Sequence, residues 1–371
     1  MLKYFPPVAK KRDRLVRERL GQPLPISNRM QLEFIPSSAI TSDASKEIEA
    51  FLDSRSNSDI DIFQYPQWSL ESLCAIYRSG GQICWFTLIS TVYPLGIQRW
   101  IRTAHLGRGP FCDELAMWHE GCMQLAGKLR REGYAYLHMY PAWTEEPQFN
   151  AGHDSAWIRS DSGRYTMRLK LDRSDEELFE GFRKTTRYDI RRALREGVEV
   201  DIPKCSDDLQ EYLRIYEKLQ QERRFGIKAT NVIQRIQWLM DSGRGTLLLA
   251  RHQGRLMGGT VLARTGRLCT YVWGATTKAE KFSAGQLLQW RAFQWAKSAG
   301  CTEYDFGNYW PGATTGPYWF KAGFGGSPIH YVATRYMVLN PVRCQVIFQS
   351  QRLKSYARRL RSSMHLFRLT L

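Results

Sequence analysis

The sequence has 371 residues, 43% of them hydrophobic, so it is too long for one ordinary domain and long enough for two with large cores. Lys and Arg outnumber Asp and Glu by 53 to 36, and the formal net charge of +17 favours a polyanionic partner such as nucleic acid, a nucleotide-sugar or an anionic membrane. No apolar stretch is long enough to span a bilayer, and the basic first residues do not make a secretory signal. The eight cysteines form no C-x-x-C pair, so we expect a reduced, cytoplasmic chain.

The first half of the chain has the order strand, strand, helix, strand. Apolar, β-branched and aromatic runs at 83–93 and 100–106 predict two paired strands. Apolar residues at helical spacing from about residue 113 predict a helix that ends at Gly133. The short apolar run 134–140 then predicts another strand.

A single helix is predicted between the halves, over residues 174–197. Ser174 and Glu177 have the spacing of a capping box, and Gly197 would close the helix. One face carries the apolar residues Leu178, Phe182, Ile190 and Ala193. Another face carries a basic ridge of residues four apart, with Lys184 beside it: Arg183, Arg187, Arg191 and Arg195. Because like charges four apart repel by roughly 0.2–0.5 kcal/mol per pair, the ridge favours a phosphate ligand; a solvated face is the structural alternative.

The second half repeats the organisation of the first. Runs at 246–251, 256–263 and 268–273, separated by Gly-containing turns, predict a meander of three strands. A helix at 285–299, then Gly300 and a strand at 302–306, follow. Each half therefore ends helix, glycine, strand, and we predict two α/β domains, each with a mixed sheet.

Six short segments, together with the strand that ends in Pro141, occur in the order of one known family, across about residues 60 to 330. They are 64–68 (QYPQW), 108–110 (RGP), 182–198 (FRKTTRYDIRRALREGV), 222–226 (ERRFG), 304–307 (YDFG) and 320–325 (FKAGFG). Together they resemble the Fem family (FemABX-like) of aminoacyl-tRNA-dependent peptidoglycan bridge transferases. The resemblance implies two tandem GNAT (acyl-CoA N-acyltransferase-like) domains with a substrate cleft between them. The first would be 25–165, completed by 325–371, and the second 166–324 with the basic helix 174–197.

The chain departs from the family pattern in three places. It lacks the long charged helical hairpin that some relatives insert in the second half. Ser69, Leu70 and Glu71 stand where relatives that hold a nucleotide-sugar peptide often have Lys. The segment 281–286 has one glycine, whereas the acyl-CoA phosphate loop of ordinary GNAT enzymes needs several, and this disfavours acetyl-CoA.

The resemblance also implies a catalytic group near the C-terminal end of the second half. It assigns Lys321 to stabilising the oxyanion or the terminal phosphate and Phe320 to stacking on the terminal adenine. Asp305, at the end of a strand, would orient the attacking amine; a turn-capping role for Asp305, and a solvated Lys321 beside a core Phe320, are the structural alternatives. The expected substrate-binding residues are Arg183, Lys184, Arg187, Arg191, Arg223, Arg224 and Tyr318.

Metal and nucleophile sites are not supported by the sequence. His119 and Glu120 lack the second histidine of H-E-x-x-H, and no G-x-S-x-G elbow or phosphate-binding G-x-x-x-x-G-K-[ST] loop occurs. The basic and apolar tail 346–371 is compatible with an anionic membrane, with tRNA or with a docked terminal helix.

We therefore expect an acyltransferase that moves an amino acid from aminoacyl-tRNA to an amine of a peptidoglycan precursor by ester aminolysis, with no cofactor beyond its donor. The enzyme would be cytoplasmic, with peripheral contact at the inner membrane face as a possibility. Two alternatives stay open: a tandem-GNAT N-acyltransferase that uses acyl-CoA or a carrier-protein thioester on a sugar or lipid amine, and a non-catalytic RNA-binding protein.

Overall fold

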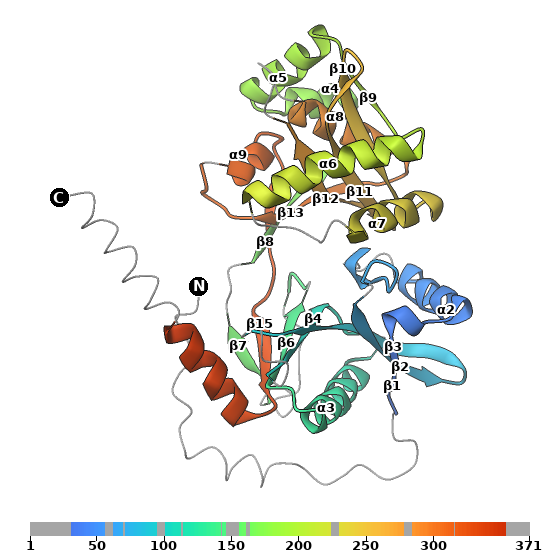
Figure 1. Cartoon of the computed structure of the whole chain (residues 1–371), viewed down its shortest axis with the longest axis vertical. Coiled ribbons are helices and arrows are strands. Elements are labelled where there is room, and N and C mark those ends of the chain that lie inside the picture. Colours follow the sequence, from blue (N-terminus) through green and yellow to red (C-terminus); the bar gives the residue numbers. More distant parts are fainter. Residues whose placement is uncertain are drawn as a thin grey trace, which may run out of the picture.

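The computed structural model describes residues 31–55, 62–69, 71–94, 101–112, 114–141, 143–145, 156–160, 164–223, 230–277, 284–314 and 316–353. Two separate sheets, one above the other along the long axis of the molecule, organise these residues (Figure 1). Both sheets are mixed and carry helices, which confirms the predicted α/β class with two mixed sheets.

The first sheet is built mainly from the N-terminal half. Its strand order is β1-β2-β3-β4-β6-β15-β7, and β5 pairs with β3. Its elements are β1 (Glu33–Pro36), η1 (Ser37–Ala39), α2 (Ser42–Asp53), η2 (Ile62–Gln64), β2 (Ser72–Ser79), β3 (Gln82–Val92), β4 (Thr103–Arg108), β5 (Phe111–Cys112), α3 (Leu115–Arg131), β6 (Tyr136–Pro141), β7 (Ile158–Ser160) and β15 (Thr334–Val338). The antiparallel pairing of β3 with β4 confirms the two paired strands predicted for this half.

The second sheet has the order β14-β8-β13-β12-β11-β10-β9. Its elements are β8 (Tyr165–Lys170), α4 (Asp175–Glu180), α5 (Lys184–Arg195), β9 (Val198–Asp201), α6 (Ser206–Arg223), α7 (Thr230–Asp241), β10 (Gly245–His252), β11 (Arg255–Thr265), β12 (Leu268–Thr276), α8 (Gly285–Ser298), β13 (Glu303–Tyr309), α9 (Gly316–Ala322) and β14 (Ser327–His330). The antiparallel run β10-β11-β12 is the predicted meander.

Each sheet contains one parallel pair joined through a helix. In the first sheet β4 and β6 are parallel and α3 connects them; in the second β12 and β13 are parallel and α8 connects them. The other strand pairs of the described residues are antiparallel. The helix-glycine-strand pattern seen twice in the sequence therefore marks two equivalent crossovers.

The single helix expected over 174–197 is wrong. The chain forms α4 and α5, separated at Gly181, Phe182 and Arg183, and Ser174 with Glu177 makes the predicted capping box of α4 only. Phe182 is 2% exposed because it enters the core between the helices, and Arg183 adopts an extended conformation (φ −56°, ψ 144°) at the N-cap of α5. Burial of one aromatic side chain thus overrides the helical spacing of its neighbours.

The return of the chain to the first half begins later than residue 325. β14 pairs with β8 in the second sheet, and only β15 pairs with β6 and β7 in the first. Residues 341–353 then form a helix, in which Cys344 and Ile347 pack against Ile101 and Ala135. The crossing between the sheets therefore lies between His330 and Thr334.

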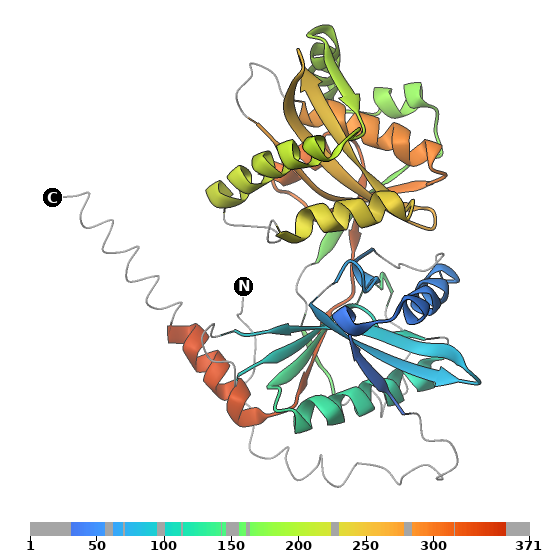
Figure 2. The ribbon, with the colours of Figure 1, turned by 45° about the vertical axis from the view of Figure 1, so that its right-hand side comes forward.

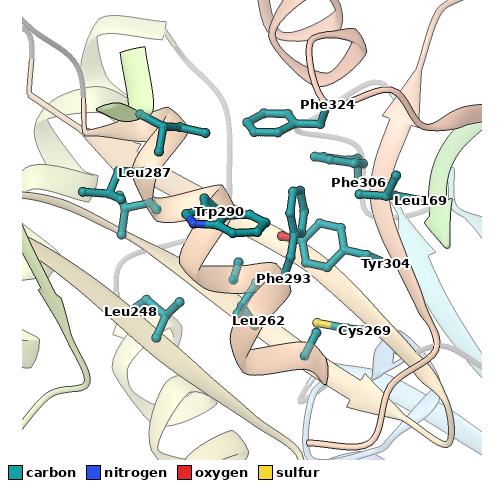
Figure 3. Packing of buried hydrophobic residues seen from close by; sticks show 14 of the residues in the cluster. Leu169, Leu248, Leu262, Cys269, Leu287, Trp290, Phe293, Tyr304, Phe306 and Phe324 are labelled. Atoms are coloured by element: carbon teal, nitrogen blue, oxygen red, sulfur yellow. The ribbon is translucent and has the colours of Figure 1, made fainter. Parts of the chain in front are cut away.

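One hydrophobic core lies wholly within the second half. Trp290 and Phe293 of α8 pack against Tyr304, Phe306 and Phe324 (Figure 3). Face-to-edge ring pairs dominate this cluster, with Phe293 4.7 Å from Tyr304 between ring centroids. Such packing holds β13 and the segment after α9 firmly in place.

A second core joins the two halves. It unites residues of α2 and β3 with residues of α6 and α7, and Figure 2 shows α7 on the side of the second sheet that faces the first half. Arg244 adds ion pairs across the junction, to Asp53 at 2.7 Å and to Glu49 at 3.2 Å. The halves are thus tied by apolar burial and by a charged clamp. None of the described helices is both long and apolar enough to cross a membrane.

Candidate functional site

Lys321 lies near the end of α9 and is 8% exposed. Its Nζ donates a hydrogen bond to the carbonyl oxygen of Asn308 on β13, at 2.7 Å. Burial lowers the pKa of Lys321 to about 8, and the negative charge of Asp305 partly opposes this shift. The side chain is therefore a buried amine that changes charge close to neutral pH, which is unlike the solvated lysine of the structural alternative.

Asp305 is 1% exposed and has its hydrogen bonds within the fold. Its carboxylate accepts from the backbone N–H of Gly307 at 2.6 Å, from the hydroxyl of Thr166, and from Nε of Arg168 at 3.3 Å. The bond to Gly307, whose φ is +69°, is the turn-capping role considered from the sequence. Asp305 thus acts on Lys321 through its charge, while its oxygens are held by neighbours.

The start of α5 lies directly against α9. The backbone N–H of Arg183 donates to the carbonyl of Gly323 at 2.8 Å, and a Cβ atom at Gly323 would clash with Thr186. The guanidinium carbon of Arg183 stands 3.6 Å from the ring centroid of Trp319, which is 47% exposed. A half-buried cation and an exposed indole therefore adjoin the helix that carries Lys321.

The basic ridge is not one continuous phosphate-binding face. Arg187 donates to the carbonyl oxygens of Glu180 and Phe182, so its charge satisfies the C-terminus of α4 at the break between the helices. Arg191 is exposed and lies 5.1 Å from the ring of Phe179, and Lys184 is exposed. Arg183, Lys184, Arg191 and the exposed Arg195, the last residue of α5, remain as cations that can meet a ligand.

The remaining predicted site residues have less distinctive surroundings. Phe320 is half-buried and packs 5.4 Å from Phe324 at the edge of the core, and Tyr318 is half-buried 6.3 Å from Tyr309. Arg223 is the last residue of α6; its side chain, and Arg224 entirely, lie outside the described residues.

A cavity of about 480 Å³ lies between the halves. Its lining residues are Phe63, Gln64, Trp68, Ser69, Leu88, Ser90, Gly107, Arg108, Tyr140, Arg164 and Arg235. Three of them are arginines and none is acidic. Arg235 is supplied by α7 of the second half, and its Nε donates to the carbonyl oxygen of Trp68 in the first half at 2.7 Å. This composition favours an anionic ligand.

Two of the cavity arginines flank one aromatic ring. The guanidinium carbons of Arg108 and Arg164 lie 5.3 Å and 5.2 Å from the ring centroid of Tyr331, and Arg108 donates to the Tyr331 hydroxyl at 3.3 Å. Arg164 donates from Nη2 to the carbonyl of Pro141 at 3.0 Å, while its buried Nη1 has no hydrogen-bond partner among the described residues. Burial, with the charge of Arg108, lowers the pKa of Arg164 to about 10. A bound anion would relieve this repulsion and accept from Nη1.

Tyr331 connects the cavity with the surroundings of Lys321. Burial raises the pKa of Tyr331, the charge of Arg108 lowers it, and the charge of Asp305 raises it. Tyr331 therefore interacts electrostatically with a residue of each site. Strand register shows the same proximity, because Thr166 of β8 pairs with Ile329 on one side and on the other with Asn308, whose carbonyl accepts from Lys321.

The family resemblance implied a substrate cleft between the halves, but sequence reasoning did not single out the cations of the cavity. Arg108 was noticed only as part of the RGP segment, and nothing in the spacing of Arg164 or Arg235 brings them together. Trp319 carried a usable signal, because it stands next to Phe320 in an aromatic run. Among the described residues, no group of three or more His, Cys, Asp or Glu is arranged to hold a metal ion.

The chain is similar in sequence to a known domain family and to a known enzyme. Residues 180–321 match the acetyltransferase (GNAT) domain family. A UDP-N-acetylmuramoylpentapeptide-lysine N(6)-alanyltransferase of Weissella viridescens is 25% identical over 158 residues, 42% of this chain and 47% of the relative. The chain thus aligns with about half the length of that curated relative.

Two solved structures share the fold across both halves. The crystal structure of FemX matches with a TM-score of 0.65 and 16% identity, over 85% of this chain and 99% of that chain. A tandem GNAT protein from the clavulanic acid biosynthesis pathway matches with a TM-score of 0.52 and 16% identity, over 84% of this chain and 99% of that one. The predicted tandem GNAT architecture is confirmed.

Proposed function

We propose that the chain is a FemABX-like aminoacyltransferase, built from two GNAT-type halves, that acts on an amine of a peptidoglycan precursor peptide. The observation that carries the proposal is Lys321, a buried lysine with a pKa lowered to about 8, at the end of the segment that matches the GNAT domain family. A cation held in a low-dielectric site stabilises developing negative charge better than a solvated one.

The reaction is aminolysis of an activated ester. The neutral acceptor amine attacks the ester carbonyl, a C–N bond forms, and the carbonyl oxygen becomes an oxyanion that the Lys321 ammonium stabilises. The intermediate collapses as the C–O bond breaks, and the proton lost by the amine goes to the departing hydroxyl. No covalent adduct with the enzyme is needed, because the ester is already activated and positioning supplies much of the rate.

The donor in this proposal is aminoacyl-tRNA. Arg183, Lys184 and Arg191 offer charges to phosphates beside α9, and Trp319 offers an exposed ring to an unpaired base. Lys321, two residues along from Trp319, would then meet the ester at the end of that strand. No cofactor beyond the donor is required.

The acceptor in this proposal occupies the arginine cavity. Ser69 lines it where relatives often place Lys, so another cation must hold the diphosphate of a nucleotide-linked or lipid-linked precursor. Arg108, Arg164 and Arg235 offer that charge from three separate elements. The peptide would extend from the cavity past Tyr331 toward Lys321.

The second candidate is an N-acyltransferase that uses acyl-CoA or a carrier-protein thioester. The match to an acetyltransferase domain family favours it. The single glycine of residues 281–286 speaks against it, because a CoA pyrophosphate needs several free backbone N–H groups.

The two candidates are separated by one transfer assay. The purified protein is incubated with nucleotide-linked and lipid-linked muramoylpentapeptides and either charged total tRNA or acetyl-CoA, and the acceptor mass is measured. We expect the mass of an aminoacyl group, from charged tRNA only. Gain of an acetyl group from acetyl-CoA, with none from tRNA, would reject the proposal. Tight tRNA binding without any transfer would instead select the non-catalytic RNA-binding protein.

A further inference from the structure

The helix formed by residues 341–353 leaves an apolar stripe facing solvent. On its inner side Cys344 and Ile347 are buried against the first half. On its outer side Val342, Val346 and Leu353 are 74%, 37% and 69% exposed. These three residues are spaced four and seven apart, so they lie along one line of the helix surface. A stripe of this kind on an outer surface has no role in the fold described so far.

The sequence beyond Leu353 keeps the same spacing of apolar residues. The pattern continues at intervals of three or four with Ala357, Leu360, Met364, Phe367 and Leu371. Positively charged residues stand between them: Arg352, Lys354, Arg358, Arg359, Arg361 and Arg368. No acidic residue follows Asp305 in the chain. The apolar stripe is therefore accompanied by positive charge alone.

We propose that the stripe of Val342, Val346 and Leu353 docks on an anionic membrane, with helix 341–353 lying in the plane of the lipid surface and the cations of the following sequence meeting the lipid phosphates. An in-plane helix needs an apolar line that enters the acyl boundary and cations that meet the lipid phosphates, and both are present here. The first half, on which the helix packs, would thereby be held at the surface. In this proposal the attachment is peripheral, through the surface of the helix.

Two other occupants fit the stripe less well. RNA would use the cations but would leave Val342, Val346 and Leu353 in water. A second copy of the chain, docked stripe against stripe, would cover the apolar line but would bring like charges together, because no acidic residue follows Asp305. Lipid with anionic headgroups satisfies both features at once.

The test uses the full chain and vesicles of phosphatidylcholine, alone or mixed with phosphatidylglycerol, in a flotation assay. We expect binding to the mixed vesicles only, weakened by salt. The triple variant V342S/V346S/L353S should lose about tenfold or more of its vesicle partition, since three exposed side chains no longer enter the lipid. The triple variant R358Q/R359Q/R361Q should lose more, at about fivefold per removed charge.

The matched control is Ile202→Ser, which changes an apolar residue 52% exposed in the second half. It should float like the parent protein, and thermal melts should show that all variants are folded. Equal flotation of the serine triple variant and the parent, or equal binding to both vesicle types, would overturn the proposal. A change of oligomeric state in the serine triple variant, with unchanged flotation, would also overturn it and would assign the stripe to a second copy. Loss of tRNA binding alone would overturn it as well.

Discussion

The two parallel strand pairs have the same connection but end differently. In the first sheet β4 and β6 stay paired to their last residues, Arg108 opposite Pro141. In the second, the pairing of β12 with β13 stops at Thr270 and Asp305, although both strands continue beyond these residues. Lys321 hydrogen-bonds to β13 in the part that β12 has left. One copy of the crossover is closed, and the other opens at the buried lysine.

The two crossovers also differ in the charged groups around them. The closed copy presents Arg108 beside a cavity without acidic lining, and burial lowers the pKa of its His105 to about 4 and of its His138 to about 3, so both histidines stay neutral. The open copy combines a buried carboxylate with a lysine that titrates near pH 8. We propose that the first of these two copies holds the anionic acceptor and that the second carries out acyl transfer.

The largest expected effect is the loss of the buried ammonium. Lys321→Met should lower kcat for transfer by about 10²–10³-fold, because the oxyanion would lose the ammonium that Lys321 holds beside Asn308. The KM for the acceptor should change little. Arg291→Met, on the exposed face of α8, is the control. A variant that keeps a tenth of the parent kcat would show that Lys321 is not a catalytic residue.

Removing a cation from the cavity should give the opposite kinetic pattern. Arg164→Met should raise the acceptor KM by about tenfold to a hundredfold, the usual worth of a hydrogen bond to a charged group, and leave kcat at saturation near the parent value. Steady-state kinetics with varied acceptor measures both constants. An unchanged KM would place the acceptor elsewhere.

The charge of Asp305 should be visible in the pH dependence. Transfer that needs the Lys321 ammonium falls as pH rises through about 8, and because Asp305 raises the pKa of Lys321, Asp305→Asn should move this fall to lower pH. The pH profile of kcat measures the shift. A profile that moves upward, or a parent enzyme without a basic limb, would contradict the assignment.

Lys321 should also link stability to pH. Its pKa is lower in the folded protein than the ordinary value of 10.5, so the unfolded chain binds more protons between about pH 8 and 10.5. The free energy of unfolding should therefore gain a contribution that rises with pH across this range. Denaturant titrations at several pH values measure this free energy for the parent and for Lys321→Met. Identical pH slopes in the two proteins would show that the lysine is not buried.

The smallest effect is expected at the start of α5. Replacing Arg183 and Arg191 with Gln should weaken tRNA binding a few-fold and lower the salt slope of log K by about 0.7–0.9 for each phosphate that the protein no longer neutralises. Arg255→Gln, an exposed arginine on β11, is the control. Unchanged salt slopes in the double variant would remove the α5 cations from the donor site.

The meander β10-β11-β12, the crossover helices α3 and α8 and the strands after them were predictable from sequence, because apolar spacing records which face of each element is buried. The break between α4 and α5 was not, because it depends on where the side chain of Phe182 is received in three dimensions. Lys321 was indicated by family resemblance, whereas its burial depends on β13 and α9 meeting. The cations of the cavity could not be predicted from local sequence patterns, because Arg108, Arg164 and Arg235 come from separate elements and from both halves.

The division of work between the halves is tested most directly by calorimetric binding of UDP-N-acetylmuramoylpentapeptide to Lys321→Met and Arg164→Met. Our account predicts parent-like affinity in Lys321→Met, because the lysine acts on the ester, and affinity at least about tenfold weaker in Arg164→Met. Weakened binding in Lys321→Met together with parent-like binding in Arg164→Met would contradict it.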